Sequence, residues 1–208
     1  MKRLALLAAL ALAALPSVLP ARTLPPRDEC AADPDFARFR AGLLDIVARH
    51  DATRLLAIVA DDIRFTFGGG EGKANFAAQW SLADPDASGL WVELATALAS
   101  GCARDGETMS APYIFRRFPD ELDAFSAGVA GPAARLYQAR SNEGESVLIP
   151  WEILDEVEWN AGTWARVRLP DGRAGFVETE HLLSPIDYRA IFQRRNGRWR
   201  MTMFIAGD

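Results

Sequence analysis

The chain has 208 residues, of which half are hydrophobic and a quarter charged, and its formal net charge is −5 at pH 7. This composition is typical of a globular protein with enough residues for one ordinary core or two small ones. The acidic balance excludes the basic electrostatic footprint expected of a nucleic-acid-binding protein.

The N-terminus has the pattern of a secretory signal peptide. Two basic residues precede an uninterrupted apolar run over residues 4–15, and two prolines and a serine then break the helix. The run is shorter than the roughly 20 residues that a stable membrane span needs. We expect residues 1–21 to be removed, with cleavage within a few residues of Ala21, and the protein to be periplasmic or secreted. The alternative is a buried N-terminal helix.

The chain has two cysteines, Cys30 and Cys102. In an oxidising compartment, an even number without metal-ligand spacing favours one disulfide over free thiols. We therefore predict a Cys30–Cys102 disulfide, the alternative being a pair of buried thiols.

Residues 22–132 are expected to form a mainly helical domain. Asp33 and Asp51 are both suited to cap a helix, and apolar residues recur every three or four positions after each of them. An alternating, β-branched and aromatic segment predicts a strand over residues 63–67. The predicted helices cover residues 34–49, the segment from 52 to 59, and residues 73–80, 88–100 and 120–126.

A β-rich domain is predicted to follow the glycines and proline of residues 128–132. Residues 164–169 and 174–179 have the composition of two strands, joined by a turn in which Gly172 can adopt a positive φ. A short apolar segment, Leu182 and Leu183, follows the second strand. We place this domain at residues 133–185.

The same segment resembles the bacterial SH3 domain. The pattern is Trp, Val three residues further on, a turn ending in Gly, then Gly, an aromatic residue, Val and a final Leu; its members here are Trp164, Val167, Gly172, Gly175, Phe176, Val177 and Leu183. The resemblance implies an SH3-like β-barrel with Trp164 and Phe176 in its core. It also implies a binding or spacing module of the bacterial envelope.

Residues 186–208 are predicted to form a C-terminal β-hairpin that packs on the rest of the protein. Two apolar segments, 188–192 and 199–205, flank Asn196-Gly197, which is the strongest short hairpin signal. With the helix–helix–strand–helix order of residues 36–80, this ending resembles the nuclear transport factor 2-like fold. The whole pattern is similar to uncharacterised exported proteins that contain an SH3 domain. The expected fold class is α+β, with a helical N-terminal half packed on the barrel.

The sequence gives little support for catalysis. The glycine-rich segment 68–72 fails as a P-loop because Phe67 and Ala74 occupy required positions. The two histidines, His50 and His181, lie in no recognisable nucleophile or metal-ligand pattern. We therefore expect no enzymatic activity, no cofactor and no metal.

Aromatic residues of the β-rich domain are the candidate ligand-binding groups. Tyr137, Trp151, Glu152 and Trp159 could form an aromatic groove beside an acidic residue, as SH3-type domains use to bind extended peptides. The ligand would be a peptide, a cell-wall fragment or an envelope protein. One alternative is a small-ligand carrier or an enzyme with a pocket near residues 67–73 and Trp80. Another is a structural partner within an envelope complex.

Overall fold

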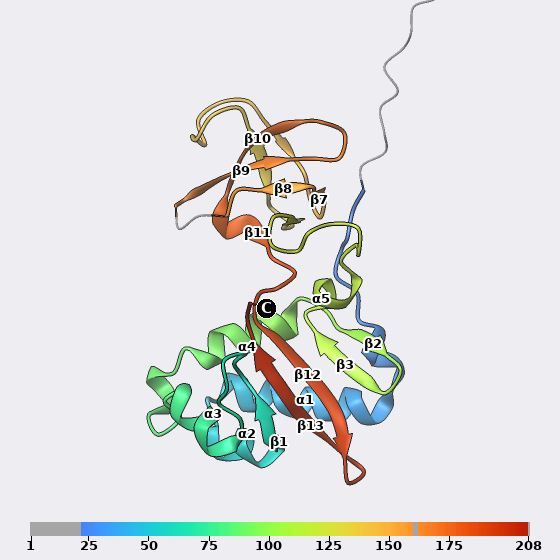
Figure 1. The fold of residues 1–208 in the computed structure, drawn as a ribbon, viewed down its shortest axis with the longest axis vertical. Helices are drawn as coiled ribbons and strands as arrows, with labels where there is room; N and C mark the ends of the chain where they lie inside the picture. The colour runs from blue at the N-terminus through green and yellow to red at the C-terminus, as the bar shows by residue number, and fades with distance from the viewer. Residues whose placement is uncertain (1–21, 160–161, 208) are drawn as a thin grey trace, which may run out of the picture.

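A computed structural model describes residues 22–159 and 162–207 (Figure 1). The predicted signal peptide, residues 1–21, lies outside the described residues. The chain is an α+β protein with N-terminal helices and three β-sheets. No helix in the described ranges is long and apolar enough to cross a membrane.

The helical half is built on a five-stranded sheet with the order β1-β13-β12-β3-β2. β1 runs parallel to β13, and the other neighbours are antiparallel. The strands β12 and β13 therefore lie inside the sheet, and its edge strands, β1 and β2, come from much earlier in the chain (Figure 1). The strands are β1 (Val59–Arg64), β2 (Ala103–Asp105), β3 (Thr108–Ala111), β12 (Arg189–Arg195) and β13 (Arg198–Ile205).

The predicted C-terminal hairpin is confirmed by β12 and β13. Asn196 and Gly197 have φ angles of 51° and 74°. Two consecutive residues with positive φ are what a type I′ turn requires, and its twist matches that of the flanking strands. The hairpin buries Phe192, Met201 and Phe204 in the core of the helical half.

The main helices pack against this sheet in one core. Asp33 accepts hydrogen bonds from the backbone amides of Asp35 and Phe36, and Asp51 accepts one from that of Arg54. Four predicted helices are thus confirmed to within about two residues at their ends. The helices are α1 (Pro34–Ala48), α2 (Ala52–Ile58), α3 (Lys73–Gln79), α4 (Leu90–Ala99) and α5 (Tyr113–Arg117), with short 3-10 segments η1 (Glu29–Ala32), η2 (Pro85–Ala87) and η3 (Thr179–His181).

In this half, one predicted strand has other bounds and one predicted helix is absent. The strand predicted at residues 63–67 is β1, which begins at Val59 and ends at Arg64, before the Thr66 hydroxyl accepts a hydrogen bond from the Gly68 amide and turns the chain. The helix predicted at residues 120–126 is a series of turns. There the Asp123 carboxylate accepts hydrogen bonds from the Phe125 amide and the Ser126 hydroxyl, a local arrangement that competes with helix formation.

Residues 128–183 form two further sheets, with the orders β6-β5-β10-β9-β8 and β11-β4-β7. Both contribute to a second core that includes Ala130, Leu154, Val167 and Leu182. The predicted hairpin is confirmed as β9 and β10, with a φ of 87° at Gly172. The strands are β4 (Gly128–Ala130), β5 (Arg135–Tyr137), β6 (Ser146–Leu148), β7 (Ile153–Leu154), β8 (Glu156–Val157), β9 (Trp164–Arg168), β10 (Ala174–Glu178) and β11 (Leu182–Leu183).

These sheets do not close into the predicted barrel. In the described residues, β6 pairs only with β5 and β8 only with β9, so both edges of the five-stranded sheet stay open. β7 and β8 contain two residues each and offer too few backbone groups to join the two sheets.

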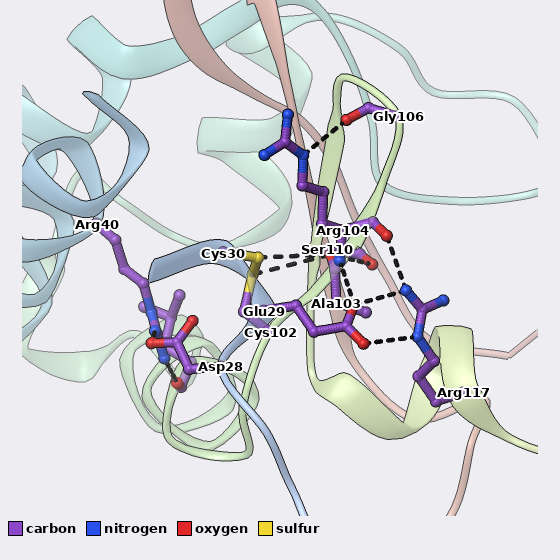
Figure 2. The surroundings of a disulfide bond; sticks show 11 residues. Asp28, Glu29, Cys30, Arg40, Cys102, Ala103, Arg104, Gly106, Ser110 and Arg117 are labelled. Carbon is purple, nitrogen blue, oxygen red and sulfur yellow. Dashed lines mark hydrogen bonds and ion pairs between the residues drawn. A yellow bond between two sulfur atoms is a disulfide. The ribbon is translucent and has the colours of Figure 1, made fainter. Parts of the chain in front are cut away.

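The segment that precedes α1 contacts both parts of the molecule. Leu24 donates a backbone hydrogen bond to Trp151 in the β-rich part, and Glu29 donates one to Cys102 beside β2. The predicted Cys30–Cys102 disulfide is present, with a Cα–Cα distance of 5.7 Å (Figure 2). It joins η1 to the residue that precedes β2.

Glu29 lies beside this disulfide and binds Arg117 of α5 (Figure 2). Its carboxylate accepts a hydrogen bond of 3.0 Å from Arg117 Nε and one of 2.9 Å from the backbone amide of Arg104. The Arg117 hydrogen bond holds the pKa of Glu29 below its usual value. The negative charge of Glu29 is therefore stabilised by folding.

We expect Glu29→Gln to lower the free energy of unfolding at pH 7 by about 1 kcal/mol or less, because the ion pair is one-third exposed. A carboxyl group whose pKa is lowered by folding stabilises the protein fully at pH values above its unfolded-state pKa. This stabilisation is lost as the pH falls through the folded-state pKa. Urea denaturation should thus show a difference in the free energy of unfolding between the wild type and Glu29→Gln at pH 7, and this difference should shrink below about pH 4. Glu107→Gln, an exposed glutamate, is the control; a difference that grows in acid would contradict the assignment.

Candidate functional site

The predicted ligand-binding residues lie in different surroundings. Trp151 has a φ of 62° and packs in a small cluster with Ile114 and Val129, whereas Trp159 packs on the core of the β-rich part. The other two members, Tyr137 and Glu152, are 8 % exposed. The four side chains thus differ in burial and surroundings, and their role in ligand binding stays a prediction.

Glu152 is engaged inside the protein. Its carboxylate lies 2.8 Å from Arg173 Nη2, and Arg173 also binds Asp171 at 2.6 Å. A buried carboxylate with such a partner is compensated within the fold. Glu152 is therefore held by Arg173, which belongs to the turn between β9 and β10.

An aromatic surface forms instead on the outer side of the sheet β6-β5-β10-β9-β8. Phe176 on β10 is paired with Tyr137 on β5, and Glu178, two residues after Phe176, is paired with Trp164 on β9. Directly paired residues share a face of the sheet, as do residues two apart along a strand. Tyr137, Trp164 and Phe176 thus lie on one side of the sheet, which we call the aromatic face. Tyr137 is nearly buried there, so Trp164 and Phe176 supply its accessible area.

The prediction that Trp164 and Phe176 lie in the core is wrong. Both side chains are half-buried and lie outside the core cluster, which takes Ala165, Val167 and Val177 from the opposite side of the same strands. Trp164 and Val167 are separated by an odd number of positions, so an extended strand points them to opposite faces. The Tyr137 and Trp164 rings meet edge to face, with centroids 5.4 Å apart.

Charged groups border the aromatic face. The Arg140 guanidinium lies over the Phe176 ring, 5.2 Å from its centroid. Within the described ranges no carboxylate lies within ion-pair distance of Arg140. The site therefore combines two half-buried aromatic rings, backed by Tyr137, with a cation that can bind an additional acidic group.

The open edge of the sheet lies next to this surface. β6 is the edge strand, and its Val147 and Leu148 side chains are 55 % and 48 % exposed. Ser146 is paired with Tyr137, and Leu148, two residues later, lies on the same side. Leu148 therefore extends the aromatic face to an edge that can accept another strand.

The chain matches no protein-family model, no curated protein and no solved structure. The site must therefore be interpreted from its own geometry.

The helical half was the other predicted location of a pocket, near residues 67–73 and Trp80. The Trp80 ring packs against Tyr188 and Phe204, with centroid distances of 5.3 Å and 5.5 Å. Phe67 is 48 % exposed and lies under the Arg189 guanidinium. Side chains thus pack around Trp80, whereas Lys73 lines a hollow together with Asp61 and the turn of the β12–β13 hairpin.

The histidines contact carboxylates and an indole. His50 stacks on Trp91, and its Nδ1 lies 3.3 Å from Asp86. His181 Nε2 lies 3.7 Å from Glu178. In the part of the chain that the structure describes, neither ring is hydrogen-bonded to a serine or cysteine, which is the contact that activates a nucleophile.

The sequence contained a signal for the aromatic face that the prediction did not use. Along β9, Trp164, Arg166 and Arg168 alternate with the small or apolar residues Ala165 and Val167. Two arginines at even spacing from the tryptophan mark the solvent side of a strand, since core positions rarely hold arginine. Strict alternation would have placed Trp164 with the arginines.

Proposed function

We propose that the chain is a non-catalytic periplasmic or secreted protein whose β-rich part binds an extended peptide. The observation that carries this proposal is the aromatic face, which lies beside the open strand β6. The peptide could belong to an envelope protein or to the cell wall.

The geometry offers two kinds of contact to such a ligand. A peptide added along β6 would gain backbone hydrogen bonds, while its alternate side chains would face Leu148 and the aromatic face. Half-buried tryptophan and phenylalanine provide large apolar contact area with little loss of side-chain entropy. Because Arg140 lies above the Phe176 ring, it would attract an acidic side chain or a terminal carboxylate of the peptide to that position.

Two further observations support the envelope location and the SH3-like interpretation. A disulfide between buried cysteines is typical of proteins that fold in an oxidising compartment, which agrees with the predicted signal peptide. The sheets of residues 128–183 share one core, as the two halves of a small β-domain do, although they do not close.

Phe176→Ala is expected to weaken peptide binding by about 2 kcal/mol, or roughly 30-fold, because it removes the central ring of the aromatic face. Isothermal titration of cell-wall stem peptides and of peptides selected from a random display library provides the measurement. Thermal melts of each variant monitor folding.

Phe125→Ala is the matched control, because Phe125 is 59 % exposed and is not part of this sheet. Its affinity should equal that of the wild type. Trp159→Ala tests whether Trp159, which the sequence predicted to contact the ligand, contributes to peptide affinity. The proposal fails if the wild type binds no peptide saturably, or if Phe176→Ala binds as tightly as Phe125→Ala.

A further inference from the structure

A basic hollow lies at one end of the sheet of the helical half, which is a different sheet from that of the aromatic face. It has a volume of about 560 Å³ and is formed by the start of β1, the start of α3 and the turn end of the β12–β13 hairpin. This volume is within the range of small-molecule sites. Its charged lining residues are Asp61, Asp62, Lys73, Arg195, Arg198 and Arg200.

Three arginines of the hairpin point to the same side of the sheet. Arg195 is paired directly with Arg198, and Arg200 lies two residues further along β13. Like charges in a direct cross-strand pair destabilise a sheet. Folding alone therefore gives no reason to place Arg195 opposite Arg198.

The charges in the hollow are only partly compensated. Lys73 Nζ lies 2.7 Å from Asp61, and the Arg200 guanidinium donates a hydrogen bond to the Ala57 carbonyl. Among the described residues, Arg195 and Arg198 have no ion-pair partner. By contrast Arg194, on the other side of β12, lies 3.6 Å from Asp33.

The hollow therefore has an excess of positive charge. Its four cationic side chains exceed its two carboxylates by two charges, in a chain whose formal net charge is −5. A phosphate monoester has a charge of about −1.5 to −2 at pH 7 and several acceptor oxygens. Guanidinium groups bind phosphate through paired N–H donors, and a carboxylate has only one charge and two oxygens to offer.

We propose that this hollow binds a phosphate monoester, held by Arg195, Arg198 and Arg200. The group could belong to a soluble metabolite or to the headgroup of a lipid, since both present the same chemistry to the arginines. This site is independent of the proposed peptide-binding function.

The test compares the full disulfide-bonded chain with the double variant Arg195→Gln/Arg198→Gln. Isothermal titration with glycerol 3-phosphate tests a soluble ligand, and sedimentation with phosphatidylcholine vesicles containing phosphatidic acid tests a lipid headgroup. We expect saturable binding by the wild type to at least one of these probes, and at least tenfold weaker binding by the variant. Succinate should bind at least tenfold more weakly than the phosphate probe.

Two controls separate binding from folding and from net charge. Without ligand, the melting temperature of the variant should equal or exceed that of the wild type, because the substitution removes the repulsion between Arg195 and Arg198. Arg38→Gln/Arg49→Gln changes the net charge equally at exposed helical positions and should bind as the wild type does.

Three results would overturn the proposal: no saturable binding of either phosphate probe, unchanged affinity in Arg195→Gln/Arg198→Gln, or succinate binding as tight as phosphate binding. Phe176→Ala should retain phosphate binding, so a failure of the peptide site and a failure of this site can be distinguished.

Discussion

Removal of the Cys30–Cys102 disulfide is expected to lower the free energy of unfolding by about 4 kcal/mol in the chain-entropy model. The two cysteines are 72 residues apart, and the loop between them contains α1 to α4 and β1. Without the bond, the unfolded chain gains the conformational freedom of that whole loop. A loss of this size is a large share of the 5–15 kcal/mol that stabilises a typical domain.

Urea denaturation of the wild type and of Cys30→Ala/Cys102→Ala measures this loss. Adding reductant should destabilise the wild type to a similar extent and leave the double variant unchanged. Thiol labelling of the unfolded, unreduced wild type should be negative. Two labelled thiols, or equal stability of the two proteins, would contradict the prediction.

Phe36→Ala is expected to lower the free energy of unfolding by about 3–5 kcal/mol, because it leaves a cavity in the largest core. Phe36 is 1 % exposed, and its ring centroid lies 5.4 Å from that of Phe192 and 5.0 Å from that of Trp199. This one side chain thus connects α1 to both strands of the C-terminal hairpin.

Leu44→Ala is the control for Phe36→Ala, because Leu44 belongs to the same helix and is 43 % exposed. Thermal and urea denaturation of both variants should show a cost for Leu44→Ala of about 1 kcal/mol or less. If both substitutions lowered the free energy of unfolding equally, the contacts of Phe36 with the C-terminal hairpin would not stabilise the core as predicted.

The features predicted well from the sequence are those set by neighbouring residues. The caps at Asp33 and Asp51 and the turn at Asn196-Gly197 depend on hydrogen bonds or φ values within a few positions. The disulfide was predictable because two cysteines permit one pairing. The failed helix at residues 120–126 was also local, but there the Asp123 side chain competes with helical hydrogen bonds.

The features that the sequence did not predict depend on contacts between distant segments. Closure of the predicted barrel requires pairing between strand edges, and no local pattern reports whether β7 and β8 are long enough for it. The aromatic face depends on the register of β5, β10 and β9. The basic hollow combines Lys73 with arginines more than a hundred residues later, so it exists only once β1 and β13 are paired.

The position of β13 has a consequence for the order in which the sheet can assemble. β13 (residues 198–205) lies between β1 and β12, although more than 130 residues separate it from β1 in the chain. β1 therefore joins the rest of its sheet only after a long-range pairing, and closing so long a loop is slow. Until that pairing forms, the apolar sides of α1 to α4 have no complete sheet to cover them. A folding intermediate that lacks β13 would therefore leave β1 without its partner and expose the first half of the chain to proteases.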